Sequence, residues 1–241
     1  GFTTLLMMTG FILFFSIVGM LDTSVAEKAR SGFNIAQMKL IYGISRLPVS
    51  EHSFAELLRS HPPVFTAATK IIIDIMSISF MTTTALGVAT ATLVSQNIGK
   101  RRPDESAAYA WESVKLGVTL MLVIGGIAFF YPEGYLGIFS QDSEVIEAGM
   151  EPLRLMGGAH FLLGIGMILA QALYGAGNTK YVMWVEMFLH FFCLVPLSYF
   201  LGIYIDLGLT GIWVAGAIYL FLVSAAMVWK FREGKWKEIR L

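Results

Sequence analysis

Long apolar stretches separated by charged loops are the main pattern along this chain. Six of them approach the ~20 residues that a helix rising ~1.5 Å per residue needs to cross a ~30 Å hydrocarbon core. They lie at residues 2–21, 71–94, 114–131, 155–174, 182–203 and 211–229. The stretches are continuous rather than alternating, which is typical of membrane helices and not of membrane barrels. The pattern therefore predicts an all-α polytopic membrane protein with six transmembrane helices.

Composition supports this prediction and narrows the function classes. The chain is 56% hydrophobic and only 14% charged, with a mean hydropathy of +0.69, which excludes an ordinary water-soluble domain. Its formal net charge is zero, so we expect no nucleic-acid partner. The single cysteine, Cys193, lies inside an apolar stretch and is read as a small packing residue. Because Gly1 directly opens a stretch without a basic leader, we expect a piece of a longer protein rather than a signal peptide.

Lysine and arginine gather in alternate loops, which predicts the orientation of the chain in the membrane. Basic residues follow the second stretch at 100–102, precede the fifth at Lys180 and fill the tail after residue 229. The connections at 132–153 and 204–210 carry acidic residues and no basic ones. We therefore expect both chain ends on the cytoplasmic side of the cell's inner membrane.

The connection between the first two stretches, residues 22–63, is too long to be a turn and carries both signs of charge. Apolar residues at near-helical spacing over 33–44 and 54–58 predict short amphipathic helices. Two arrangements remain open: helices lying on the outer membrane surface, or an insert that packs on the protein. Either arrangement makes this segment an extracytoplasmic insert of unassigned role.

The second stretch is the most polar, and its hydrophilic groups follow one helical face. This stripe runs through Lys70, Asp74, Ser77, Met81, Thr84, Val88, Thr92 and Ser95. Ionisable groups in a bilayer normally face a bundle interior or a water-filled cavity, so Asp74 and Thr84 are candidate coupling or cavity residues. The alternative is a local pair between Lys70 and Asp74 near the outer interface. The neighbouring threonines fit helix packing as well as a cavity wall.

The fifth stretch contains the other intramembrane carboxylate, Glu186, with His190 one turn later on the same face. A carboxylate beside an imidazole can exchange protons near neutral pH, so this pair is a candidate proton relay. Glu186 lies near the cytoplasmic boundary and Asp74 near the outer one, so the two cannot share one small site. His160, in the fourth stretch, is read as a packing or hydrogen-bonding residue.

Sequence motifs for catalysis are absent from the chain. It contains no glycine-rich phosphate loop, no histidine or cysteine cluster with metal-ligand spacing and no nucleophile with a recognisable base. We therefore expect a protein that is not an enzyme and needs no cofactor, with any metal ligand unknown. The sequence also lacks an ATP-binding domain, so energy, if the protein uses any, would come from an ion gradient.

Several motifs resemble one transporter family in order and spacing. Residues 85–100 form a glycine-containing helix that ends with Gln96 and Gly99 before a basic loop. The segment from Gln171 to Thr179 ends in Gly175-Ala-Gly177-Asn178-Thr. Residues 211–217 and the basic tail 231–236 complete the pattern. Together they resemble the multidrug and toxic compound extrusion (MATE) transporters.

This resemblance implies that the chain is the C-terminal six-helix lobe of a twelve-helix antiporter, whose partner is the N-terminal lobe of the same protein. Such antiporters exchange Na⁺ or H⁺ for small organic, often cationic, compounds by alternating access around a central cavity. Gln171 and Thr84 are of a type that suits such a cavity. Residues 2–21 and 155–174 lack the acidic residues that several family branches carry, so the coupling carboxylate lies either in the other lobe or at Asp74 or Glu186.

Rival functions remain open. A lipid-linked oligosaccharide flippase shares the superfamily's helix plan, but its cavity is richly basic, whereas these stretches carry few basic residues. An intramembrane enzyme would need a catalytic dyad or metal cluster that the sequence lacks. A passive channel would continue to conduct after its ion gradient is collapsed.

Overall fold

The computed structural model describes residues 2–30 and 64–239, and within them the chain is almost entirely helical. The long helices are α1 (Phe2–Arg30), α4 (Val64–Gly99), α5 (Pro103–Phe130), α7 (Ser143–Gly175) and α10 (Gly208–Glu233). A further long helix runs from Thr179 to Tyr204 and consists of α8 (Thr179–Leu189), η1 (His190–Leu194), α9 (Val195–Tyr199) and η2 (Phe200–Tyr204). Two short elements complete the fold, α6 (Pro132–Gly137) and the 3₁₀ turn η3 (Lys235–Glu238).

Five of these helices are long and apolar enough to cross a membrane, which confirms an all-α polytopic membrane protein. The described apolar part of α1, Thr9–Ser24, is shorter than the other spans. Helices extend beyond most of the predicted apolar stretches, because polar residues continue the helix past the hydrocarbon core. Thus α1 continues to Arg30 and includes the start of the predicted insert. The amphipathic helices predicted within 33–58 lie outside the described residues.

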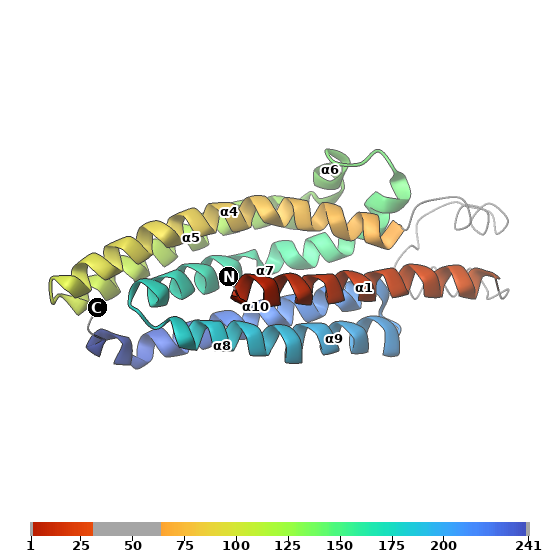
Figure 1. Ribbon diagram of the computed structural model, residues 1–241. Helices are drawn as coiled ribbons and strands as arrows, with labels where there is room; N and C mark the ends of the chain where they lie inside the picture. Colours follow the sequence, from red (N-terminus) through yellow and green to blue (C-terminus); the bar gives the residue numbers. More distant parts are fainter. Residues whose placement is uncertain (1, 31–63, 240–241) are drawn as a thin grey trace.

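Helix α7 forms the centre of the bundle. It packs along α4, α5 and α10 and is the most buried of the five spans. Figure 1 shows α4 and α5 side by side on one side of α7, with α8, α9 and α10 on the other. Helix α1 joins the two groups, because it contacts α4 as well as α8, α9 and α10.

Glycines allow α7 to approach its neighbours closely. A Cβ atom at Gly164 would lie 3.1 Å from the carbonyl of Gly117 on α5, and one at Gly175 would lie 2.7 Å from the Cα of Ala91 on α4. Small residues at such crossings bring helix backbones together, and membrane helices associate in this way because lipid supplies no hydrophobic drive between them.

Asp22 of α1 caps the first turn of α4. Its carboxylate accepts hydrogen bonds from the backbone N–H groups of Phe65 and Thr66, both at 3.0 Å, and from the Thr66 hydroxyl at 2.6 Å. The first N–H groups of a helix have no partner within the helix, and an acidic side chain there is also favoured by the helix dipole. The side chain therefore fastens the two helices together at this end.

The long helix 179–204 contains two π-helical turns on either side of Pro196. The sequence predicts a kink there because proline has no N–H to donate to the preceding turn. In η1 each backbone hydrogen bond spans five residues instead of four, as in a π-helix. The Val195 N–H, for example, donates to the carbonyl of His190. The widened turn places the proline at the start of α9, where a missing N–H is tolerated.

Candidate functional site

The polar stripe of α4 lies on a face that no described part of the chain covers. Asp74, Ser77 and Gln96 are exposed, whereas Ile72 and Ile75 are buried against the bundle. Among the described residues, no salt bridge joins Lys70 to Asp74, so the alternative of a local pair gains no support. The exposed face of α4 therefore combines these polar groups with apolar side chains, among them Met81 and Val88.

The threonine hydroxyls of α4 mostly bond within their own helix. Those of Thr82, Thr83 and Thr90 donate to the carbonyl four residues earlier, at 2.8, 2.8 and 2.7 Å. This geometry favours the packing interpretation of these threonines. Thr84 differs, because its half-buried side chain has a hydroxyl oxygen without a partner. Thr69 of the same helix shares this property, and both hydroxyl oxygens are buried.

A second group of polar residues lies inside the bundle around Glu186 of α8. Glu186 is only 8% exposed, and its carboxylate accepts a hydrogen bond from the Tyr174 hydroxyl of α7 at 3.3 Å. In the described chain no lysine, arginine or histidine pairs with it. A carboxyl with one neutral partner and no cation is suited to exchange a proton or to bind a cation.

His190 occupies the same helix face but makes no hydrogen bond to Glu186. Its ring is 3% exposed, and neither ring nitrogen has a partner among the described residues. The ring instead packs against Gly10 of α1 and lies edge-on to Phe11 and Tyr219, each with a centroid distance of 5.5 Å. The predicted direct relay is therefore not formed here.

The surroundings of His190 are nevertheless unusual for a packing residue. Buried polar atoms are nearly always paired, so two ring nitrogens without a partner in the described chain are an exception that packing alone does not explain. His190 also begins the π turn η1, and such turns occur often at functional sites. Tyr174, Glu186, His190 and Tyr219 thus form one internal polar cluster contributed by α7, α8, η1 and α10.

His160 has the packing role that the sequence indicates. Its Nδ1 lies 2.9 Å from the carbonyl of Met156, and its Nε2 lies 3.0 Å from the Ser79 hydroxyl of α4. Because the carbonyl only accepts, Nδ1 carries a proton, and Nε2 can accept from the serine. His160 therefore ties α7 to α4 with both nitrogens used.

The motif residues shape helix ends and crossings. Gln96 and Gly99 lie exposed at the end of α4. Gly177 has a positive φ of 80°, which suits glycine, and the N–H of Asn178 donates to the carbonyl of Leu173 at 2.9 Å before α8 begins. The side chain of Gln171 packs on α4, where a Cβ at Gly87 would lie 2.6 Å from its Cγ.

Several residues of these sites escape sequence reasoning. Asp22 looks like an ordinary span end, and the tyrosines Tyr174 and Tyr219 have no motif around them. In the part of the chain that the structure describes, no group of three or more histidine, cysteine, aspartate or glutamate residues could hold a metal ion.

Comparison with known proteins places these features in context. The MatE family model matches residues 54–200. The chain is 27% identical over 216 residues to "Probable multidrug resistance protein NorM" of Thermotoga maritima, covering 90% of the chain and 46% of that protein. It is 25% identical over 168 residues to the NorM of Mannheimia succiniciproducens, covering 68% of the chain and 36% of that protein.

A plant protein is similar to the same degree. The chain is 26% identical over 183 residues to "Protein DETOXIFICATION 18" of Arabidopsis thaliana, covering 76% of the chain and 39% of that protein. The chain thus spans less than half the length of the curated relatives it matches.

Proposed function

The chain belongs to the MatE family, and on that premise we propose that it is the C-terminal six-helix lobe of a twelve-helix antiporter that exports small organic, often cationic, compounds in exchange for Na⁺ or H⁺. Its partner is the other lobe of the same protein, and the substrate crosses the cell's inner membrane by alternating access between the two. Both ends of the chain lie on the cytoplasmic side in this proposal. The protein lies in the lipid bilayer, and no nucleic acid or cofactor takes part in transport.

The observation that carries the proposal is the set of polar side chains exposed on α4. A helix that met lipid along this face would place Asp74, Ser77 and Gln96 against hydrocarbon, which is costly. A helix that lined a water-filled cavity between two lobes would place the same groups in water. The carboxylate of Asp74 would then meet an organic cation from this side, whereas the buried hydroxyl of Thr84 would take part only if the packing around it opened.

Coupling is assigned to the internal cluster around Glu186. The carboxyl is buried away from the α4 face, so a proton or Na⁺ bound there acts on the packing of α7, α8 and α10 rather than by touching the substrate. Water between Glu186 and His190 would connect the two predicted relay residues.

A flippase for lipid-linked sugars is the second candidate in this superfamily. Its cavity would need basic side chains for a pyrophosphate head group. Over Val64–Gly99 the sequence of α4 has Lys70 as its only basic residue, and it lies near one end of the helix. This composition favours the organic-cation exporter.

Efflux from liposomes tests the proposal. The full-length protein that contains this chain is reconstituted with a fluorescent organic cation inside, and Na⁺ and H⁺ gradients are imposed separately and then collapsed. We expect efflux that requires one gradient and stops when it collapses. If neither gradient drives efflux, the exporter proposal fails and lipid flipping becomes the leading function.

The coupling assignment is tested in the same assay with Glu186→Gln. This change keeps the shape and the acceptor for Tyr174 but removes the titratable group, so gradient-driven efflux should fall at least tenfold. Glu112→Gln is the matched control, because Glu112 is exposed on α5 and pairs with Lys115. Normal coupling in both variants and in Asp74→Asn would move the coupling site to the other lobe.

A further inference from the structure

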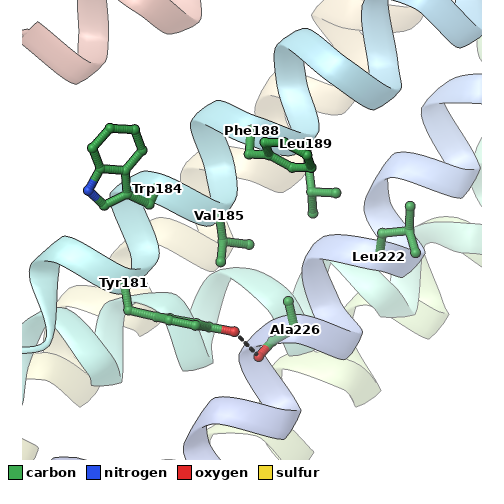
Figure 2. Close-up of a pocket in the computed structure, with 7 residues that line it drawn as sticks. All are labelled: Tyr181, Trp184, Val185, Phe188, Leu189, Leu222 and Ala226. Atoms are coloured by element: carbon green, nitrogen blue, oxygen red, sulfur yellow. Dashed lines mark hydrogen bonds between the residues drawn. The ribbon is translucent and has the colours of Figure 1, made fainter.

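An apolar groove lies on the outer surface of the lobe, between α8 and α10 (Figure 2). Its volume is about 550 Å³. Figure 2 shows its lining side chains, which come from one side of α8 and from two turns of α10. They are Tyr181, Trp184, Val185, Phe188, Leu189, Leu222 and Ala226.

The groove lies on a surface that differs in character from the α4 face. On α8 the side chains of Trp184 and Phe188 are 60% and 58% exposed, and on α10 Phe221 and Trp229 are also exposed. Such a continuous apolar and aromatic surface on a membrane helix faces lipid, whereas the exposed face of α4 also carries Asp74, Ser77 and Gln96. A groove on this surface is therefore filled by hydrocarbon.

The length of the groove fits one lipid chain. From Tyr181 to Leu189 the helix rises ~12 Å at ~1.5 Å per residue, and one leaflet of a ~30 Å hydrocarbon core is ~15 Å deep. Leu222 and Ala226 form the opposite wall one turn apart, and the Tyr181 hydroxyl closes one end by donating to the carbonyl of Ala226 at 3.1 Å.

Basic side chains lie at that closed end. Lys230 lies one turn beyond Ala226, with its Nζ 5.0 Å from the centroid of the Tyr181 ring. Glu233 pairs with Lys230 at 2.5 Å and also with Lys235. Lys180, next to Tyr181 at the start of α8, is exposed. Lys180 and Lys230 therefore lie at this end of the groove, and Glu233 is the carboxylate that pairs with Lys230 there.

We propose that this groove is a binding site for an anionic phospholipid, with one acyl chain between α8 and α10 and the phosphate at Lys180 and Lys230. The apolar walls hold the chain, and the surplus positive charge selects an anionic head group over a zwitterionic one. The site is separate from the α4 face and from Glu186, so it does not depend on the transported substrate. Trp184 lies near the same end, as aromatic residues do at membrane interfaces.

Photocrosslinking locates the lipid directly. The full-length protein in detergent is incubated with phosphatidylglycerol that carries a diazirine in one acyl chain, irradiated and digested, and the labelled peptides are mapped by mass spectrometry. We expect labelling within 181–189 and 222–226, competed by unlabelled phosphatidylglycerol and much less by phosphatidylcholine. If both segments remain unlabelled, or a second copy of the chain crosslinks there instead, the proposal is wrong.

Two variants separate the acyl-chain and head-group contributions. Leu222→Trp fills the groove and should abolish labelling there, whereas Leu122→Trp on the exposed surface of α5 should leave it unchanged. Lys180→Ala should weaken phosphatidylglycerol binding about fivefold, as expected for one lysine near an anionic head group, and Lys115→Ala should not. Equal affinity for the two lipids, or no effect of Lys180→Ala, would overturn the anionic assignment even if Leu222→Trp failed to fold.

Discussion

Replacing Gly157 by alanine tests the close crossing of α5 and α7 on which the bundle depends. A Cβ atom at Gly157 would lie 2.7 Å from the carbonyl oxygen of Gly125 and 2.8 Å from the backbone nitrogen of Phe129. These are backbone atoms, which cannot rotate away as the end of a side chain can. The two helices must therefore separate, and forcing an extra carbon into a packed interior costs ~1–3 kcal/mol.

The adjacent Gly126 supplies a matched control. No atom lies within 4 Å of a Cβ built there. Glycine to alanine in a helix gains up to ~1 kcal/mol from helix propensity at either position. This gain cancels when the two variants are compared, so Gly157→Ala should be less stable than Gly126→Ala by ~1–3 kcal/mol, the cost of the clash.

The assay is reversible unfolding of the full-length protein in bicelles by increasing denaturant, with the two variants and the parent measured side by side. Gly126→Ala should be more stable than the parent, and Gly157→Ala should be the least stable of the three proteins. If the free energies of unfolding of the two variants agree within ~0.5 kcal/mol, the reasoning is refuted. The same gain in helix propensity would then account for both variants, with no clash at Gly157.

Three further changes test other contacts in the same unfolding assay. Asp22→Ala should destabilise by ~1–2 kcal/mol because α4 loses its cap, and Asp22→Asn should restore part of this; equal stability of both with the parent would contradict the cap. Ser79→Ala should cost ~1–3 kcal/mol because it leaves Nε2 of His160 unpaired in the interior, and a variant as stable as the parent would contradict this pairing. Trp236→Ala should cost ~3–5 kcal/mol, since this buried ring stacks on Phe231; a loss below ~1 kcal/mol would show that η3 does not pack on α10.

Hydrophobic length and helical spacing were enough to predict much of the fold. Apolar stretches predict membrane helices because a bilayer imposes their length, and this all-helical prediction is confirmed. The same spacing predicts that Asp74 and Ser77 share a face, and the structure places both on the exposed side of α4. Their roles in transport stay predictions. The predicted ends of the helices were less accurate, because capping and polar turns extend the helices beyond the apolar core.

Contacts between distant segments were not predictable from the sequence. Asp22 meets the start of α4 across more than forty positions of chain. Helical spacing correctly puts Glu186 and His190 on one face, but it cannot show that the carboxyl turns to Tyr174 of α7 while the imidazole turns to Gly10 of α1. Which neighbour each side chain contacts depends on how the helices pack, and local patterns in the sequence do not specify that packing.

Labelling of α4 by a membrane-impermeant thiol reagent tests most directly whether its polar face lines a transport cavity. The full-length protein, freed of its own cysteines, carries Ser77→Cys or, as a lipid-facing control, Phe192→Cys. We expect Ser77→Cys to react and the transported organic cation to slow this reaction, while Phe192→Cys stays unlabelled. Labelling of Phe192→Cys with no reaction at Ser77→Cys would place the α4 face in lipid and contradict the account.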